Sequence, residues 1–404
     1  MKLYFPKVKV VTGLATVLLA IAPEMLAQVT GRVYLEKESY AVGEPLMFTL
    51  EIKNSGKEPI QLYPRVPGQG LGNFSFSMQK AAGENPGRSC GAAWNLPENS
   101  ADPHELKGDG TYTYEWPLDF WYRIEHEGTY KVAISGNVLF SSLQGGTQRV
   151  QFSSDSDLNI VPGEPAHVEE VLSKFEADLR SSDYDIQHNA LDVLSTTAPS
   201  YFHDDIFRVA RDKDPFIAMH GAGALERINT SDARALLAEI IITRKADDLD
   251  EQNLRCEAIH ALGNSGDASY LQMLAPYTEH VNSCESEFAM IAMAKLGRED
   301  AVPLLQGLLQ STQVKQRLSA ITALRLTASP DAVDALIGAL RDKDEGVRER
   351  AASSLIMLTG NSVVTADQPA PSPLQLESLW LVWWGKHRKE TKLSEPGPEI
   401  CRME

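Results

Sequence analysis

The stretch DKDEGVRERAASSL at residues 342–355 repeats an earlier stretch, DKDPFIAMHGAGAL at residues 212–225. The two share Asp, Lys, Asp, Ala and Leu at identical spacing. Weaker copies end at four further leucines: Leu194, Leu262, Leu296 and Leu324. The six leucines, in chain order, are 31, 37, 34, 28 and 31 residues apart. Intervals of this length are typical of repeat proteins, so the repetition decides the fold class of residues 166–360.

Each repeat reads as two amphipathic helices. Apolar residues after Asp331 recur at helical spacing: Val333, Leu336, Ile337 and Leu340. The next segment does the same with Val347, Ala351, Leu355 and Leu358. An Asp precedes Ala in four of the first helices, at Asp232, Asp267, Asp300 and Asp331, where it can cap the helix and complement its dipole. The pattern predicts an all-α solenoid of about six helix pairs, in which each apolar stripe is covered by the neighbouring repeat.

The repeats resemble the HEAT family, in particular the short bacterial form that also occurs in phycobilin lyases. The matching residues are the Asp-x-Asp pairs (Asp212 with Asp214, Asp342 with Asp344), Val347-Arg348 and Ala351-Ala352. The lyases act on a bilin and on a partner protein inside the cell. Repeat similarity transfers the fold and not the activity. The export signal and the additional β domain, both described below, also argue against the lyase role here.

Arg255, Arg317 and Arg348 occupy the same position in their repeats. They are the candidate binding residues, because a row of guanidinium groups on the concave face suits an acidic ligand. The resemblance offers an alternative: in the family, an Arg at this position pairs with the Asp of an adjacent repeat.

The N-terminus has the order of a secretory signal. Three lysines (Lys2, Lys7 and Lys9) precede an apolar run from Val10 to Ala22, and a small residue follows at Ala27. The run is shorter than the roughly 20 residues that span a bilayer. We expect residues 1–27 to be a signal peptide cleaved after Ala27, which makes the protein periplasmic or secreted. An uncleaved N-terminal anchor is the alternative, and no other membrane contact is expected.

Residues 28–163 predict an antiparallel β-sandwich. Leu46, Phe48, Leu50 and Ile52 alternate on one face of a strand. Strands are also expected at 31–37, 60–63, 73–79, 111–118, 129–135 and 148–160. About seven short strands without helical periodicity are typical of a sandwich. The segments 39–46 and 124–132 resemble parts of immunoglobulin-like domains of exported bacterial proteins.

Two features of this domain bear on binding. Tyr112, Tyr114 and Trp116 form either a sugar-binding platform or a buried sheet face, and their strict alternation favours the buried face. The segment 68–110 is rich in Gly, Pro, Asn and Ser. We expect it to be a long excursion between strands and the likelier recognition surface of the domain, because long loops often carry binding residues.

The tail, residues 361–404, begins with a Pro-rich linker over 366–373. A stripe of apolar residues follows: Leu374, Leu376, Leu379, Trp380, Trp383 and Trp384. Solenoids need capping elements, so we expect a helix that covers the last repeat. A membrane-surface helix beside the nearby Lys386, Arg388 and Lys389 is the alternative.

Cysteines and charge narrow the function classes. Cys90, Cys256, Cys284 and Cys401 form no C-x-x-C pair that would indicate zinc or redox chemistry. In an oxidising compartment Cys256 and Cys284 could form a disulfide between neighbouring repeats, and free buried thiols are the alternative. The formal net charge of −17 disfavours nucleic acid as a partner.

No catalytic, cofactor-binding or metal-binding residue is predicted. The sequence contains no His-Glu-x-x-His, no phosphate-binding glycine loop and no Gly-x-Ser-x-Gly. His126 and His280 lie near carboxylates, as surface histidines often do. The acidic run Asp247, Asp248, Asp250 and Glu251 lacks the ligand spacing of a calcium loop, and a charged approach to a helix explains it as well.

The sequence therefore favours an exported, non-enzymatic scaffold that binds one or more proteins through its solenoid surface. Two alternatives stay open. One is an enzyme or enzyme accessory with a site near 162–165, at the junction of the predicted domains. The other is carbohydrate or cell-wall binding through the β domain.

Overall fold

The computed structural model describes residues 28–63, 74–80, 104–120, 124, 126–142, 146–197, 200–245, 248–280, 284–364 and 370–394. The predicted signal peptide and its cleavage point after Ala27 lie outside these residues. The pattern of contacts within the chain divides it into two compact units, with the boundary in the sequence between Tyr201 and Phe202. Each unit is described below by itself.

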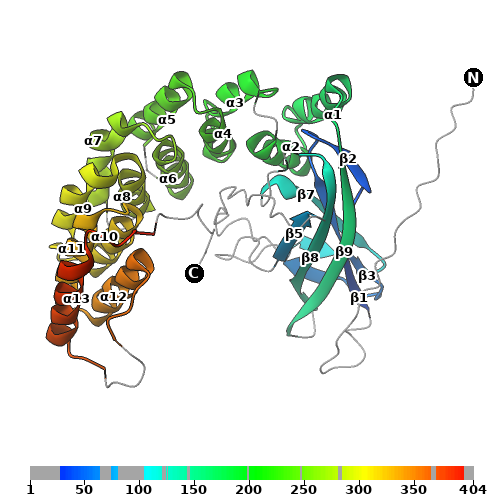
Figure 1. Ribbon diagram of the computed structural model, residues 1–404. Coiled ribbons are helices and arrows are strands. Elements are labelled where there is room, and N and C mark those ends of the chain that lie inside the picture. Colours follow the sequence, from blue (N-terminus) through cyan, green and yellow to red (C-terminus); the bar gives the residue numbers. More distant parts are fainter. Residues whose placement is uncertain are drawn as a thin grey trace, which may run out of the picture. The chain divides into compact units, whose positions relative to one another are not determined.

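The first unit contains two β-sheets. Three strands form one antiparallel sheet in the order β1-β3-β7: β1 (Val29–Leu35), β3 (Met47–Asn54) and β7 (Thr111–Pro117). The second sheet has the order β2-β9-β8-β4-β6, with β5 paired to β8. Its strands are β2 (Ser39–Ala41), β4 (Ile60–Tyr63), β5 (Phe74–Lys80), β6 (His104–Leu106), β8 (Gly128–Ser142) and β9 (Thr147–Val161). Figure 1 shows the long strands β8 and β9 running side by side.

The expectation of a purely antiparallel fold is wrong in one place. The three-residue strand β2 pairs with β9 in parallel, with Tyr40 opposite Ile160. Such a short strand carries too little alternation to reveal its direction or its partner, so the sequence analysis missed it. The second sheet is therefore mixed. The immunoglobulin-like topology stays a prediction.

One apolar core is shared by the two sheets. Phe48, Leu50 and Ile52 of β3 point into it, as their alternation predicts. Gly31 of β1 lies so close to the opposite sheet that an added Cβ would lie 3.1 Å from the ring of Phe152. Position 31 therefore favours glycine because the two sheets approach each other closely there.

Apart from β2, the predicted strands agree with the observed ones to within a few residues, with two further exceptions. β8 continues past the predicted end at 135 to Ser142, through Gly136 and Asn137. β6 was not expected. Most of the predicted excursion over 68–110 lies outside the described residues, apart from β5 and β6.

The first helix pair, α1 (Pro165–Asp178) and α2 (Tyr184–Thr196), belongs to the first unit. α2 packs on β7 and on the 3₁₀ turn Leu118–Phe120 that follows it. Their helical periodicity predicts that these helices belong to the solenoid, which was expected to begin at residue 166. In the division by contacts both helices fall with the β-sheets, and the solenoid boundary expected at residue 166 stays a prediction.

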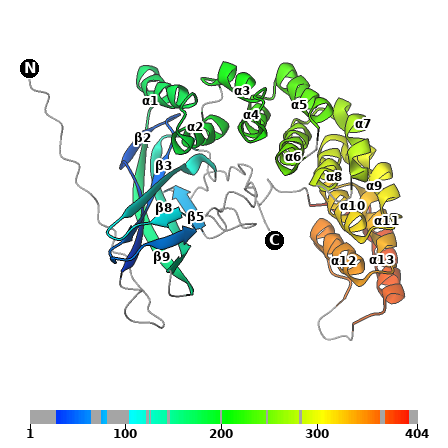
Figure 2. The same cartoon turned by 180° about the vertical axis from the view of Figure 1, so that it is seen from behind.

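The second unit is helical. Its helices are α3 (His203–Val209), α4 (Pro215–Ile228), α5 (Ser231–Thr243), α6 (Leu249–Gly263), α7 (Leu271–Leu274), α8 (Cys284–Gly297), α9 (Val302–Leu308), α10 (Val314–Leu326), α11 (Pro330–Ala339), α12 (Glu345–Thr359) and α13 (Pro373–His387). Figures 1 and 2 show α4, α6, α8, α10 and α12 along the inner side of the arc that this unit forms. We call these five helices the inner row, and consecutive members of it pack against each other.

The helix caps differ in part from the expectation. Asp267 caps a short 3₁₀ turn as predicted, with its carboxylate accepting from Ser269 N. At α5 and α11 the caps are Thr230 and Ser329 instead. The hydroxyl oxygen of each cap residue accepts from a free backbone N–H of the first turn. Asp232 and Asp331 lie after the cap residue, within the first turn, where they complement the helix dipole.

Helix α13 lies against α11, the outer helix of the last pair. Trp380 and Trp384 are buried, and Trp384 Nε1 donates to Asp334 Oδ1 over 3.0 Å. Arg388 pairs with Asp331 at 2.7 Å and with Asp334 at 2.5 Å. α13 therefore covers part of the last repeat. Among the described residues, no helix has the length and hydrophobicity to cross a bilayer.

Candidate interaction surface of the helical repeats

Arg317 links two successive repeats. Its guanidinium forms a bidentate pair with Asp342, with Nε 2.7 Å from Oδ2 and Nη2 2.9 Å from Oδ1. Nη1 also donates to the carbonyl oxygen of Ser311. The Arg317 side chain is only 2% exposed. Burial is the largest influence on the carboxyl of Asp342 and opposes its ionisation. The hydrogen bonds from Arg317 and from the backbone of Asp344, together with the charges of Arg317 and Lys343, outweigh burial and hold the pKa of Asp342 below its ordinary value.

Arg348 closes the turn before its own helix. Nη1 donates to the carbonyl oxygens of Asp342 over 2.9 Å and of Lys343 over 3.2 Å. In the repeat where Ala218 replaces this arginine, Arg244 donates to the equivalent carbonyls of Asp212 and Lys213 from the end of α5. The turn needs these donors because its carbonyls have no partner in the helix that follows. Sequence spacing did not identify Arg244, because it comes from a different repeat position.

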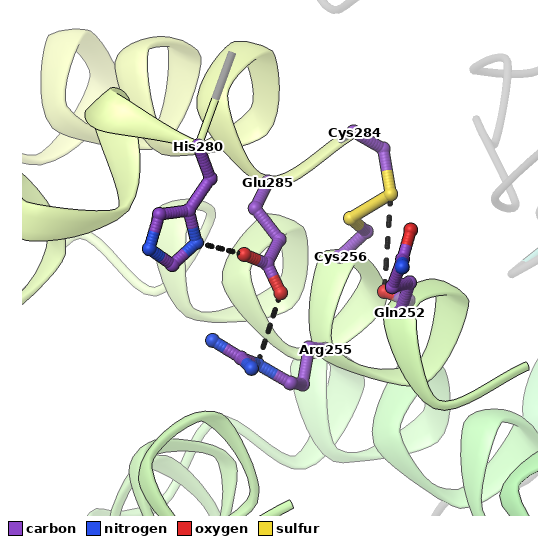
Figure 3. The surroundings of a disulfide bond; sticks show 6 residues. All are labelled: Gln252, Arg255, Cys256, His280, Cys284 and Glu285. Atoms are coloured by element: carbon purple, nitrogen blue, oxygen red, sulfur yellow. Dashed lines mark hydrogen bonds and ion pairs between the residues drawn. A yellow bond between two sulfur atoms is a disulfide. The ribbon is translucent and has the colours of Figure 1, made fainter. Parts of the chain in front are cut away.

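Arg255 belongs to a cluster that joins α6 to α8 (Figure 3). Its Nε lies 3.0 Å from Glu285 Oε1, and its guanidinium lies over the Tyr277 ring, 5.2 Å from the centroid. Glu285 is buried and also contacts His280 Nδ1. His280, which the sequence analysis regarded as a surface residue, therefore shares a carboxylate with Arg255.

A disulfide accompanies this ion pair. Cys256 follows Arg255 on α6 and Cys284 precedes Glu285 on α8, and the two sulfur atoms are bonded, with the Cα atoms 6.0 Å apart (Figure 3). The structure thus places the two cysteines as the bridge between neighbouring repeats that the sequence allowed. A covalent bond and an ion pair hold the same two helices together.

The three candidate arginines are thus engaged within the repeats. Arg317 pairs with the Asp of the adjacent repeat, Arg348 binds turn carbonyls and Arg255 binds a buried carboxylate. This geometry favours the pairing role over ligand binding, since an external anion would have to displace an internal partner.

One polar cluster on the inner row joins α4, α6 and α8. His260 Nδ1 lies 3.7 Å from Glu226 Oε2 and 3.9 Å from Glu257 Oε2. Asn264 donates to Glu226 Oε1 over 3.0 Å and accepts from Lys295 Nζ over 2.7 Å. Two carboxyl groups, an imidazole and an ammonium thus lie together, and their charges largely compensate each other.

Glu257 is the unusual member of this cluster. Its side chain is 1% exposed, and neither oxygen accepts a hydrogen bond from any described residue. Burial, and then the charge of Glu226, raise the pKa of Glu257 well above its ordinary value. A buried carboxyl without donors is most stable as the neutral acid. Glu257 was not predicted, because nothing in its sequence spacing distinguishes it from a surface glutamate.

The acidic run at residues 247–251 spans the beginning of α6 and stabilises that end of the helix. Asp248 caps the helix, accepting from Glu251 N over 2.9 Å, and Glu251 pairs with Arg244 at 2.9 Å. Burial and neighbouring carboxylates raise the pKa of Asp250. Asp247 lies outside the described residues. These contacts favour the helix-start explanation over a calcium site.

In the first unit, the aromatic residues of β7 lie mainly in the core. Tyr114 and Trp116 are buried, with ring centroids 4.0 Å apart, and Trp116 stacks on Phe48. Tyr112 is half-buried beside His104. This geometry favours the buried-face explanation over a sugar-binding platform.

The first unit also has an open hollow of about 450 Å³ on the face of β5, β8 and β9. Its polar lining residues are Ser77, Gln79, Lys131, Asp155, Ser156 and Asp157. Small side chains on adjacent strands leave this space. Its lining contains no aromatic ring, so it lacks the stacking surface that the sugar-binding alternative required.

Comparison with known proteins identifies the repeats. Residues 304–366 match the family of HEAT repeats. No curated protein matches the chain. The match and the fold agree that the C-terminal helical region carries HEAT-like repeats, which generally mediate protein–protein interaction and are not themselves catalytic.

Solved structures resemble the chain only weakly. YibA of Escherichia coli is 18% identical over 48% of this chain and 75% of its own, with a TM-score of 0.32. Human deoxyhypusine hydroxylase is 16% identical over 54% of this chain and 97% of its own, with a TM-score of 0.27. The CpcE–CpcF complex of phycocyanin lyase from a Nostoc species is 16% identical over 53% and 82%, with a TM-score of 0.30. Scores this low carry no functional argument.

Proposed function

We propose that this protein is an exported, non-enzymatic scaffold that binds a protein partner through the inner row of its HEAT-like repeats. The observation that carries the proposal is the unbroken series α4, α6, α8, α10 and α12, in which each helix packs on the next. Such a series displays side chains from every repeat along one surface, so affinity is distributed over many contacts.

Export is supported by two features. The sequence of residues 1–27 has the basic, apolar and small-residue order of a secretory signal. The Cys256–Cys284 disulfide suits an oxidising compartment, since thiols of cytosolic proteins are kept reduced. The proposal includes both a periplasmic and a secreted location. In it, the β-sheet unit provides a second contact with the protein partner.

The test starts from the full mature chain, immobilised and incubated with cell-envelope and secreted fractions. Retained proteins are identified by mass spectrometry, and the affinity of a purified candidate is then measured for two variants. Ser353→Trp adds bulk to an exposed site on α12 of the inner row. Gln306→Trp, the matched control, adds the same bulk to an exposed site on the outer helix α9.

We expect Ser353→Trp to weaken binding about tenfold or more and Gln306→Trp to leave it unchanged. Retention of no protein, or equal binding by both variants, would refute the use of the inner row. Intact-mass measurement of the protein from its native host tests export separately: it should begin at Gln28 and carry the disulfide.

A further inference from the structure

The charge of α10 is opposite to that of the whole chain. The helix contains Lys315, Arg317 and Arg325 and no Asp or Glu, in a chain with a formal net charge of −17. Asp342 neutralises Arg317. Lys315 and Arg325 have no such partner among the described residues. A local excess of positive charge therefore lies on one helix of the inner row.

The surrounding arginines make this excess notable. Arg341 pairs with Glu377, and Arg388 pairs with Asp331 and Asp334. Arg317, Arg341 and Arg388 thus each have a carboxylate beside them, and Arg348 instead donates to two turn carbonyls. Arg325 is half-buried, so an unpaired charge there costs more than at the surface, and yet it has no carboxylate partner within the described part of the chain.

A second unpaired arginine approaches Arg325 from the next inner helix. Arg350 of α12 places Nη1 3.4 Å from Thr322 Oγ1 on α10. Thr322 is three residues before Arg325 and therefore lies on the same helix face. Arg350 contacts no carboxylate among the residues that the structure describes. Burial, and then the charge of Arg350, lower the pKa of Arg325, which agrees with two like charges that face each other.

Two arginines that approach each other from adjacent helices, with no carboxylate partner among the described residues, suit an anion, because the anion removes their repulsion and accepts their hydrogen bonds. The neighbouring side chains on α12 suit a peptide: Ser353 and Met357 are exposed and lie one and two turns from Arg350 on its face. They offer a hydrogen-bonding group and an apolar contact beside the two charges.

We infer that Arg325 and Arg350 bind a carboxylate of an acidic peptide segment of the protein partner, on the inner face of α10 and α12. The inference rests on the proposed function and names the chemistry of the partner. Planar guanidinium groups match the geometry of a carboxylate, and the charge of the peptide is complementary to this face.

The test uses the full mature chain and a fluorescein-labelled oligoglutamate peptide, with binding followed by fluorescence polarisation. The variant is Arg325→Gln with Arg350→Gln. The matched control, Arg208→Gln with Arg211→Gln, removes the same charge at α3, where Arg208 pairs with Asp205 and Arg211 donates to the Phe207 carbonyl. Circular dichroism checks that both variants are folded.

We expect the Arg325 and Arg350 variant to bind the peptide about tenfold more weakly or worse, since charged hydrogen bonds are lost. The control variant should bind the peptide like the wild type. Oligoglutamine should bind neither to the wild type nor to the control variant. Three outcomes would overturn the inference: no binding by the wild type, equal loss in both variants, or displacement of the peptide by inorganic phosphate but not by glutarate.

These outcomes are separable from those of the proposed function. If the natural partner is retained equally by the wild type and by the Arg325 and Arg350 variant, the scaffold function stands and the carboxylate site is wrong. If the wild type retains no partner, the scaffold function itself fails, whatever the peptide does.

Discussion

The pairing of Arg317 with Asp342 shows how single residues hold successive repeats together. A guanidinium that is 2% exposed satisfies a carboxylate and turn carbonyls at once. Removal of one partner leaves the other buried groups without hydrogen bonds. The resulting loss of folding free energy exceeds the net stabilisation that the intact pair provides.

We predict that Arg317→Met destabilises the protein by about 3 kcal/mol, measured as the change in free energy of unfolding in urea. The pair of the exposed Arg208 with Asp205 is the control, and Arg208→Met should cost less than about 1 kcal/mol. A cost for Arg317→Met as small as that of the control would contradict a structural role for this pair.

Glu257 allows a prediction about pH. Its pKa is raised above the ordinary value of 4.5, so the folded state holds the proton more tightly than the unfolded state does. Its contribution to stability is therefore fully present below about pH 4.5 and is lost as the pH rises through the folded-state pKa. His260 and Glu226 face it from α6 and α4, and Lys295 of α8 lies beyond Asn264.

Glu257→Gln should consequently become more stable relative to the wild type as the pH rises from 4 to 8, by about 1–3 kcal/mol in total. Urea unfolding at a series of pH values measures this difference. Glu226→Gln, which changes a partly exposed member of the cluster, should show a smaller effect. Parallel curves for wild type and Glu257→Gln would show that Glu257 is not neutral in the folded protein.

At the scale of elements, α6 and α8 are joined twice. The disulfide closes a segment with a sequence separation of 28 residues, and the Arg255–Glu285 pair lies next to it. Closure of this segment restricts the unfolded chain, which is the larger part of the stabilisation in the chain-entropy description.

The double variant Cys256→Ala with Cys284→Ala should lose about 3 kcal/mol of stability, measured by urea unfolding without reductant. Each single substitution should cost nearly as much as both together, because either one breaks the bond. Additive costs of the two single substitutions would mean that the sulfur atoms act independently and that no bridge forms.

The predictability of these elements follows from the range of the forces involved. Helical periodicity and the spacing of Leu225, Leu262 and Leu355 identify the repeats, because the covering of apolar stripes is a local requirement. The roles of Arg244 and Glu257 depend on which groups approach from other repeats. No local pattern encodes that approach, and the parallel partner of the short strand β2 was missed for the same reason.

At the scale of the whole molecule, the division into units depends on contacts rather than on secondary structure. α1 and α2 have the helical periodicity of the repeats, yet α2 packs on β7 and on the turn that contains the buried Leu118. The strands thus cover part of α2 within the first unit.

A comparison of fragments tests this division. Residues 28–201 should unfold cooperatively, and residues 28–163 should be less stable by about 2 kcal/mol or more, since loss of α2 exposes apolar surface of β7 and Leu118 to water. Thermal unfolding followed by near-ultraviolet circular dichroism reports on Trp116 within this core. Equal stability of the two fragments, with no helical signal from 164–201, would restore the boundary expected from periodicity.

A helical, cooperatively unfolding fragment 202–394 would show in addition that the repeats after Tyr201 form a complete solenoid without α1 and α2.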